Sequence, residues 1–366
     1  MKILTVFLFF LLVCSCKKDS NTPQPGEVDI YMAGYESLPN LATYWKNGIA
    51  THLTDGSKGG AEAHAILVVG NDVYAAGGEG INPMYWKNGI PHTLPMGPAG
   101  RTAIANAIAV VGNDVYVAGT ETGFYPGTNL LGTVARCWKN DVRLTFFASE
   151  FFGSAATSIA VYGNDVYVAG YAFEGYSLDS IGLPCGDRCQ HYEEVTYWKN
   201  GVPVYISHGA TMQAQATGIA VSGTDVYVSG DVLYDATTLI GGQAAYWKNG
   251  VMVYLPDGTN QVRTSGIAVS GSDVYVSGTT SNGGDYPKPL YWKNGVGISL
   301  QGIGQQVSGS AMGIAVDGSD IYVAGNLFYT TPIGIAPKCW KNNSPLATSI
   351  DSTKLAVSKS IFVIKK

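Results

Sequence analysis

Hydrophobic and polar residues alternate with a period of two along most of the chain, in short runs separated by Gly, Asn and Asp. The clearest run is Asp-Val-Tyr-Val-Ala-Gly at 114–119, and similar runs begin at six further aspartates. β-Branched and aromatic residues in such runs are typical of β-strands. The pattern therefore predicts a strand, called strand B, after each of seven aspartates: Asp29, Asp72, Asp114, Asp165, Asp225, Asp273 and Asp320.

Each strand B belongs to a larger unit of four predicted strands. Strand A is an Ile-Ala-Val run, as at 108–110, and Gly-Asn-Asp forms a tight turn into strand B. Strand C carries Tyr-Trp-Lys, as at 197–199, and Asn-Gly then forms a two-residue hairpin turn into strand D. The seven tryptophans of the chain, spaced 41 to 60 residues apart, each mark one strand C: Trp45, Trp86, Trp138, Trp198, Trp247, Trp292 and Trp340. We expect them to pack between neighbouring units.

Four short antiparallel strands repeated at this spacing predict an all-β fold, a seven-bladed β-propeller with four-stranded blades. A solenoid is the main alternative, but solenoids usually hold a tighter period and lack paired hairpins in every unit. The first unit begins at strand B, whereas residues 355–364 offer a strand A and a further strand B. We therefore expect both termini to close the last blade, with one strand B surplus, because closure removes exposed sheet edges.

The string Ile-Ala-Val-x-Gly-x-Asp-Val-Tyr-Val-Ala-Gly resembles the repeats of bacterial β-propeller proteins that are secreted or held at the cell surface. It is also similar to the inner two strands of kelch repeats, and the likeness covers residues 28–366. The Gly-Gly pair that follows strand B in kelch repeats occurs here only at Gly77-Gly78. The resemblance implies a propeller and an extracellular setting, but no activity, because propellers have diverse functions.

The N-terminus has the features of an export signal, which we assign to residues 1–15. Lys2 precedes an apolar run that is too short to span a bilayer. The next residues, Val-Cys-Ser-Cys, resemble a bacterial lipobox, which implies lipidation of Cys16, including palmitate, and attachment to the outer membrane or cell surface. An ordinary secretory signal is the alternative. Residues 16–27 are polar with two prolines and predict a tether, so that residues 28–366 form the propeller domain.

The two faces of the predicted propeller differ. The A–B and C–D turns are short, whereas the B–C loops on the opposite face are long, the longest spanning 171–196. Binding residues concentrate in loops on a rigid scaffold, and tyrosine offers a large amphipathic contact. The candidate ligand contacts in these loops are Tyr176, Tyr192 and Tyr234. The alternative is that these rings only fasten their own loops.

A second candidate site lies where the inner strands A surround the axis. Two positions before the Ile of strand A most units carry a polar residue, and the next residue is usually small: the ring is His64, Asn106, Thr157, Thr217, Ser265, Met312 and Thr353. We expect these side chains to line the channel mouth and take His64, Asn106, Thr157, Thr217 and Ser265 as candidate ligand contacts. The alternative is that they only satisfy backbone groups at strand ends.

The remaining chemistry-bearing residues favour structural roles. Cys185 and Cys189 lie in the longest loop, and we expect a disulfide between them in an oxidising exterior. A zinc site with His191 is the alternative, but four ligands at a familiar spacing are missing. Cys137 and Cys339 are expected to be buried free thiols. The turn aspartates lack the clustered oxygens of a calcium site, so no metal and no cofactor are predicted.

Composition and motifs narrow the function. Charged residues are 13% of the chain, the net charge is −5, and no Lys/Arg run occurs in the folded part, which argues against a nucleic-acid partner. Nucleophile-elbow, metalloprotease and P-loop motifs are missing as well. The sequence therefore predicts a lipid-anchored, monomeric surface module that binds a glycan or a protein on its long-loop face. A glycan hydrolase or lyase and a purely structural envelope protein are the alternatives.

Overall fold

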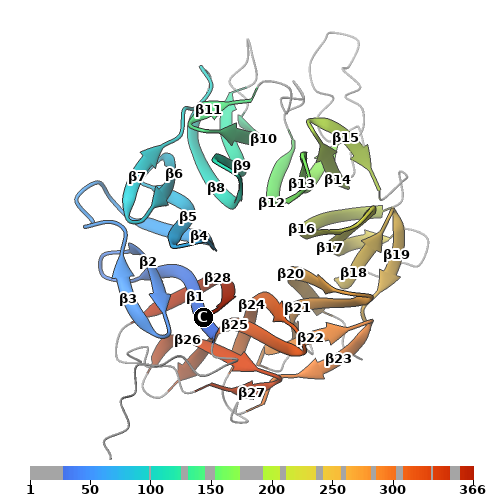
Figure 1. Ribbon diagram of the computed structural model, residues 1–366. Coiled ribbons are helices and arrows are strands. Elements are labelled where there is room, and N and C mark those ends of the chain that lie inside the picture. Colours follow the sequence, from blue (N-terminus) through green and yellow to red (C-terminus); the bar gives the residue numbers. More distant parts are fainter. Residues whose placement is uncertain are drawn as a thin grey trace, which may run out of the picture.

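The chain forms a ring of seven four-stranded antiparallel sheets around a central axis (Figure 1). This computed structural model describes residues 28–98, 100–124, 131–144, 153–173, 193–206, 212–235, 242–256, 261–281, 286–301, 308–330, 333–346 and 355–366. The predicted seven-bladed propeller is therefore confirmed. These ranges contain no helix that is long and apolar enough to cross a membrane.

Blade 1 combines the two ends of the chain. From the axis outward its strands are β28 (Ala356–Lys365), β1 (Val28–Glu36), β2 (Leu41–Lys46) and β3 (Ile49–His52).

The other six blades follow the order of the chain from the axis outward. Blade 2 contains β4 (Ala61–Val69), β5 (Asp72–Glu79), β6 (Asn82–Lys87) and β7 (Ile90–Thr93), and blade 3 contains β8 (Gly100–Val111), β9 (Asp114–Phe124), β10 (Leu131–Lys139) and β11 (Val142–Arg143). Blade 4 contains β12 (Ala155–Tyr162), β13 (Asp165–Phe173), β14 (Glu193–Lys199) and β15 (Val202–Tyr205), and blade 5 contains β16 (Met212–Ser222), β17 (Asp225–Asp235), β18 (Gln243–Lys248) and β19 (Val251–Tyr254). Blade 6 contains β20 (Gln261–Ser270), β21 (Asp273–Ser281), β22 (Lys288–Lys293) and β23 (Val296–Ser299), and blade 7 contains β24 (Ser308–Asp317), β25 (Asp320–Thr330), β26 (Ile333–Lys341) and β27 (Ser344–Pro345).

Both termini close blade 1, as expected. β28 pairs with β1 along its whole length, from Val28 opposite Lys365 to Glu36 opposite Ala356. The expected division of the last unit into a strand A, a turn and a surplus strand B is wrong. Ser358-Lys359-Ser360 forms a bulge within β28 and not a turn, so that β28 is the strand A of blade 1 and β1 is its strand B.

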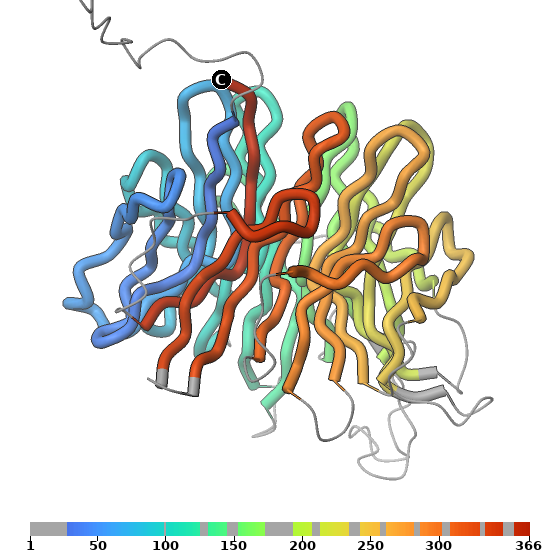
Figure 2. Tube along the Cα trace, turned by 90° about the horizontal axis from the view of Figure 1, so that it is seen from below, coloured from blue at the N-terminus to red at the C-terminus, as the bar shows by residue number. Residues whose placement is uncertain are grey.

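In blade 1, the start of β1 and the end of β28 lie on the face that carries the A–B turns (Figure 2). Lys365 Nζ lies 3.2 Å from Oδ1 of Asp317, which ends β24 at the A–B turn of blade 7. β1 begins beside the end of β28, because Val28 is paired with Lys365. We call this side the turn face and the opposite side the loop face.

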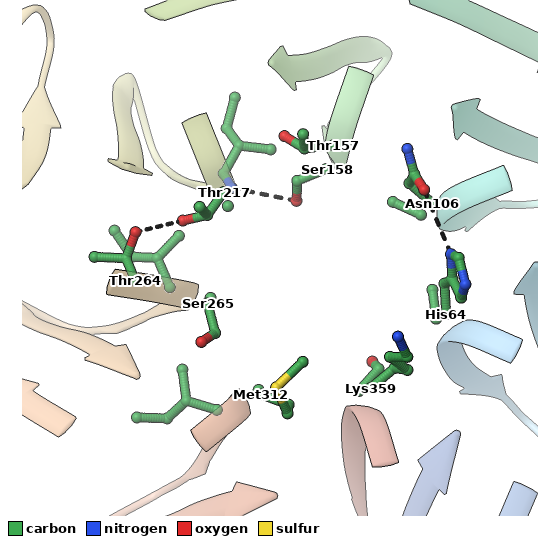
Figure 3. Close-up of a pocket in the computed structure, with 18 of the residues that line it drawn as sticks. His64, Asn106, Thr157, Ser158, Thr217, Thr264, Ser265, Met312 and Lys359 are labelled. Carbon is green, nitrogen blue, oxygen red and sulfur yellow. Dashed lines mark hydrogen bonds between the residues drawn. The ribbon is translucent and has the colours of Figure 1, made fainter. Parts of the chain in front are cut away.

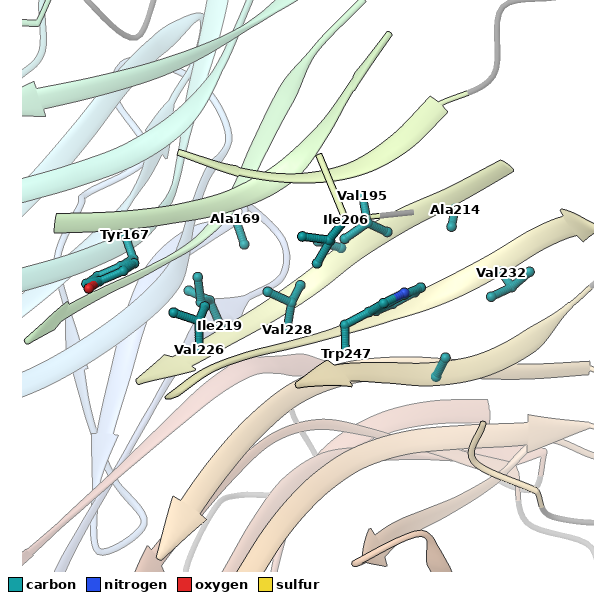
Figure 4. Packing of buried hydrophobic residues seen from close by; sticks show 12 residues of the cluster. Tyr167, Ala169, Val195, Ile206, Ala214, Ile219, Val226, Val228, Val232 and Trp247 are labelled. Carbon is teal, nitrogen blue, oxygen red and sulfur yellow. The ribbon is translucent and has the colours of Figure 1, made fainter. Parts of the chain in front are cut away.

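The tryptophans lie between neighbouring blades. Trp247 of blade 5 packs with Val195 and Ile206 of blade 4, within one cluster of buried side chains (Figure 4). All seven tryptophans are almost completely buried. An aromatic side chain buries roughly 150–250 Å², which stabilises the fold by about 4–6 kcal/mol at 25 cal/mol per Å². Cys137 and Cys339 are buried free thiols, as expected, and burial raises the pKa of each to about 12.

A set of side-chain contacts on the turn face repeats in every blade. In blade 3, Asn140 Nδ2 donates to Asp114 Oδ1 at 2.7 Å, and Asn140 Oδ1 accepts from the backbone N of Val115 at 2.8 Å. Lys139 Nζ lies 2.7 Å from Asp114 Oδ2 and 5.1 Å from the centre of the Tyr116 ring. Lys139 and Asn140 hold the pKa of Asp114 below its ordinary value. The Asp that opens each strand B therefore joins the A–B turn to the C–D turn.

The hairpin turns have the predicted geometry. The first turn residue after each strand C is an asparagine with φ between 48° and 52°, as a type I′ turn requires. The following residue, usually Gly, is also in the left-handed region, for example Gly201 with φ 85°. The Asn of the repeat therefore shapes the turn with its backbone and binds the Asp with its side chain.

Candidate functional site: the axial cavity

Each of the seven inner strands carries a β-bulge at the same place. The register with strand B shifts by one residue, as between Ala63 and Ala65 of β4, so that one residue is extra. The extra residues are His64, Asn106, Thr157, Thr217, Ser265, Met312 and Lys359. Six of these seven are the residues predicted to form the ring. A bulge redirects a side chain out of the strand's regular alternation, and here it directs them to the axis (Figure 3).

The glycine that ends each Val-Tyr-Val-Ala-Gly run lies opposite the bulge. Gly77 pairs with Ala63, the residue before His64. A Cβ atom on Gly77 would overlap the backbone oxygen of Glu62, and one on Gly325 would overlap that of Ser310. The same conflict occurs at the other five: Gly34, Gly119, Gly170, Gly230 and Gly278. The repeated glycine is therefore required because the bulged backbone approaches strand B too closely for a side chain.

The ring position of the last repeat differs from the prediction. The sequence pointed to Thr353, which lies outside the described residues, and the structure has Lys359 there. Lys359 is followed by Ser360 and Ile361, just as His64 is followed by Ala65 and Ile66. The order of bulge residue, small residue and Ile could have identified Lys359, but Leu-Ala-Val at 355–357 imitates strand A more closely.

Five of the ring residues form a hydrogen bond to the next blade. Asn106 Nδ2 donates to the backbone O of Ala156 at 2.8 Å, and Thr157 Oγ1 donates to the backbone O of Ala216 at 3.0 Å. In each case the acceptor is the residue before the next bulge. The other links are Ser265 Oγ to Ala311 O at 2.5 Å, Thr217 Oγ1 to Thr264 Oγ1 at 2.7 Å, and His64 Nδ1 to Asn106 Oδ1 at 3.4 Å. Asn106, Thr157 and Ser265 therefore bond backbone groups of the next blade, whereas His64 and Thr217 bond side chains.

Two strand-B residues also bond the residue before the neighbouring bulge. Met312 has no polar group, and in its blade Asn326 bonds the residue before Lys359 instead. Ser358 N donates to Asn326 Oδ1 at 2.7 Å, and Asn326 Nδ2 donates to Ser358 O at 2.9 Å. The equivalent residue of blade 5, Asp231, accepts from Thr264 N at 2.7 Å and from Thr264 Oγ1 at 2.9 Å.

The ring surrounds an axial cavity of about 610 Å³. Hydroxyl and amide groups dominate the polar part of its wall, with Ser158, Gln215 and Ser360 beside the ring, and Ile and small residues form the apolar part. Among the described residues, the charged side chains in the wall are Asp231, Arg263 and Lys359, and no Phe, Tyr or Trp lines it. The cavity is therefore a polar site that offers many hydrogen bonds and little aromatic surface.

The charges around the cavity occur in two groups. On one side, Glu62 Oε2 lies 3.3 Å from His64 Nε2 and 3.5 Å from Lys359 Nζ. The hydrogen bond from His64 lowers the pKa of Glu62, and burial opposes this effect. On the other side, Arg263 Nη1 lies 3.6 Å from Asp231 Oδ2. Burial raises the pKa of Asp231, and the bonds from Thr264 counteract this only in part.

The other predicted site residues are not brought together by the described structure. Tyr176, Tyr192, Cys185, Cys189 and Cys16 lie outside the described residues, so their roles stay predictions.

Tyr234 pairs through its backbone with Gln213 near the end of β17, and its side chain is outside the description. Sequence reasoning did not anticipate Asp231, Arg263 or Lys359 in the cavity wall, because their approach depends on the bulges.

The sequence matches no family model and no curated protein. Solved structures with a related arrangement include apo AztD from Citrobacter koseri, at 13% identity and a TM-score of 0.39, over 92% of this chain and 98% of that one. A triple arginine-to-alanine mutant of AofleA from Arthrobotrys oligospora has 11% identity and a TM-score of 0.38, over 92% of each chain. Trypanosoma rangeli sialidase in complex with sialic acid has 8% identity and a TM-score of 0.36, over 87% of this chain and 55% of that one. Similarity at this level assigns no function.

Proposed function

We propose that this protein is a lipid-anchored surface module that binds the end of a glycan chain in the axial cavity. The observation that carries the proposal is the convergence of side chains from all seven blades on one cavity of about 610 Å³. A wall of hydroxyl and amide groups matches the hydroxyl-rich surface of a sugar. A protein partner would instead need a broad contact area, typically about 800 Å² on each side.

The acid–base pair of a hydrolase or lyase is the main competing function. Asp231 favours it, because this carboxyl lines the cavity and its pKa is raised. However, Oδ1 of Asp231 already accepts two hydrogen bonds from Thr264. The equivalent residue of blade 7 is Asn326, which makes the corresponding contact to Ser358 without a titratable group. Asp231 is therefore better explained as a link between blades, and the geometry favours binding over catalysis.

The glycan part of the proposal is tested with a filled cavity. Met312→Trp adds bulk at the one ring position that has no polar group, so it should close the cavity without removing a hydrogen bond. Val296→Trp is the matched control, because Val296 is 66% exposed on the outer strand of blade 6. In a glycan array, Met312→Trp should lose the signals of glycans without an N-acetyl group, which the parent and the control retain. Equal binding by all three proteins would place the glycan site elsewhere.

The anchoring part is tested separately. Cys16→Ala should move the protein from the membrane fraction to the soluble fraction, because Cys16 is the residue that the lipobox pattern marks for lipidation. Mass spectrometry of the native protein should find lipid on an N-terminal Cys16. Retention of the Cys16→Ala variant in membranes would contradict this part alone.

A further inference from the structure

The junction between blades 2 and 3 shows how the repeat satisfies a buried indole and a buried carboxylate. Trp138 Nε1 donates to the backbone O of Pro95 at 2.8 Å. Two residues later, the backbone N of Gly97 donates to both carboxylate oxygens of Glu121 at 3.1 Å. Arg136 Nε completes the set at 2.8 Å from Glu121 Oε2. The connection that leaves β7 therefore supplies one acceptor to the tryptophan and one donor to the glutamate.

The junction between blades 1 and 2 has the same two side chains but lacks these partners. Trp86 and Glu79 occupy the positions of Trp138 and Glu121, and they are 1% and 6% exposed. Trp86 Nε1 has no hydrogen-bond partner among the described residues. The contact to Glu79 is an ion pair with the exposed Lys58, whose Nζ lies 3.6 Å from Oε2. Neither group therefore receives what the equivalent connection gives in blade 3.

The two junctions differ in their hydrogen bonds because the connection that leaves β3 takes another path than the one that leaves β7. The connection after β3 runs from Leu53 to Gly60 and is longer than the one after β7, which ends before Gly100. The backbone N of Ser57 donates to Asp55 Oδ1 at 2.9 Å, so the connection forms a local turn. A cavity of about 350 Å³ results, lined by His52, Thr54, Asp55, Ser57, Lys58, Glu79 and Trp86, with Leu53 and Pro91 as its apolar wall. We call it the junction cavity.

We propose that the junction cavity is a second ligand site, which binds the acetamido group of an N-acetylated sugar. The blade 3 junction shows which groups the site takes: a carbonyl oxygen for the indole N–H and an N–H for the carboxylate. An acetamido group offers one of each. The hydroxyls of the sugar ring meet Thr54, Ser57 and Asp55 in the same wall. Trp86 Nε1 is covered in this structure, so a bond from this atom to the ligand carbonyl requires the 53–60 connection to move outward.

A buried donor without a partner destabilises the protein, and a ligand that supplies the acceptor recovers this cost. The site should therefore bind an amide more tightly than a hydroxyl ligand of similar size. The site is independent of the axial cavity, because the two share no lining residue. Binding at one site can therefore fail while binding at the other is retained.

The experiment measures binding of N-acetylglucosamine to the full-length protein, with glucose as the control sugar that lacks the amide. Titration is followed by the indole N–H signals in a proton–nitrogen NMR spectrum, where the Trp86 signal is the one that disappears in Trp86→Phe. N-acetylglucosamine should shift this signal downfield, and glucose should not. Glu79→Ala should weaken binding at least tenfold, whereas Met312→Trp in the axial cavity should leave it unchanged.

Three results would overturn the proposal. The first is an unshifted Trp86 signal at saturating N-acetylglucosamine. The second is equal binding of glucose, which would remove the role of the amide. The third is binding of N-acetylglycine methylamide in place of the sugar, which would make the site a peptide site. Trp138→Phe is the matched control for the tryptophan change: it should leave N-acetylglucosamine binding intact, because Trp138 already has its carbonyl partner.

Discussion

The two tryptophans at these junctions give a test of the structure that needs no ligand. Trp86→Phe and Trp138→Phe each replace an almost fully buried indole by a smaller ring, so the loss of packing is similar in both. Trp138→Phe also removes the 2.8 Å hydrogen bond to Pro95 and leaves that carbonyl without its donor. Trp86→Phe removes a donor that has no partner among the described residues. A buried donor without a partner costs about 1–3 kcal/mol, and Trp86→Phe removes this cost, so Trp138→Phe should destabilise the protein by about that much more.

The assay is urea unfolding followed by circular dichroism, with the midpoints compared at a common slope. Trp292→Phe serves as a second reference, because its Nε1 donates to Pro256 at 3.1 Å. It should lose about as much stability as Trp138→Phe. Equal losses for all three variants would show that the Trp86 N–H has a partner after all, and would remove the basis for the junction cavity as a ligand site.

Three further changes test other parts of the fold. Gly325→Ala should lower the melting temperature far more than Gly112→Ala, because a Cβ at 325 meets the backbone of Ser310. A Cβ at 112 meets open space, so only the left-handed φ of 59° at this residue costs about 1 kcal/mol. Similar melting temperatures would contradict the close approach at the bulge. Deletion of residues 355–366 removes β28 and should cause aggregation on mild heating, since β1 becomes an exposed edge; a variant that melts like the parent would refute closure by both termini. Burial raises the pKa of Asp231, so its ionisation lowers stability as pH rises through that value. Asp231→Asn should therefore stabilise the protein at neutral pH, with a difference that shrinks in acid, and unfolding midpoints that differ by the same amount at pH 4 and pH 7 would contradict this.

The features that could be predicted from the sequence are those that depend on neighbouring residues. The alternation of Val-Tyr-Val, the Asn-Gly turns and the regular spacing of tryptophans predicted seven four-stranded blades. Six of the seven ring residues followed, because strand A had to line the axis. The role of Asp114 did not follow, because its partner Asn140 is a side chain that only the folded blade brings close.

The bulges were missed for a physical reason. A bulge is a change of register between two strands, so the order of polar residue, small residue and Ile in strand A does not by itself indicate an extra residue. The sequence feature that marks the bulge is the glycine in strand B, such as Gly77. In the sequence this glycine resembles a strand end, and only the structure shows the Glu62 backbone beside it. The junction cavity depends on the path of a single connection, and no local pattern shows that residues 53–60 turn away from Trp86.

The position of β1 within blade 1 determines how the propeller responds to force. A tether attached at Val28, as predicted for residues 16–27, would pull on the second strand of the blade, which is hydrogen-bonded on both sides. Its register runs over nine residue pairs with β28 and six with β2. A pull along the strand loads these bonds in shear, so they must break together, whereas a pull across the sheet would open them one after another. A protein held at this end in moving fluid would therefore resist unfolding where the load enters.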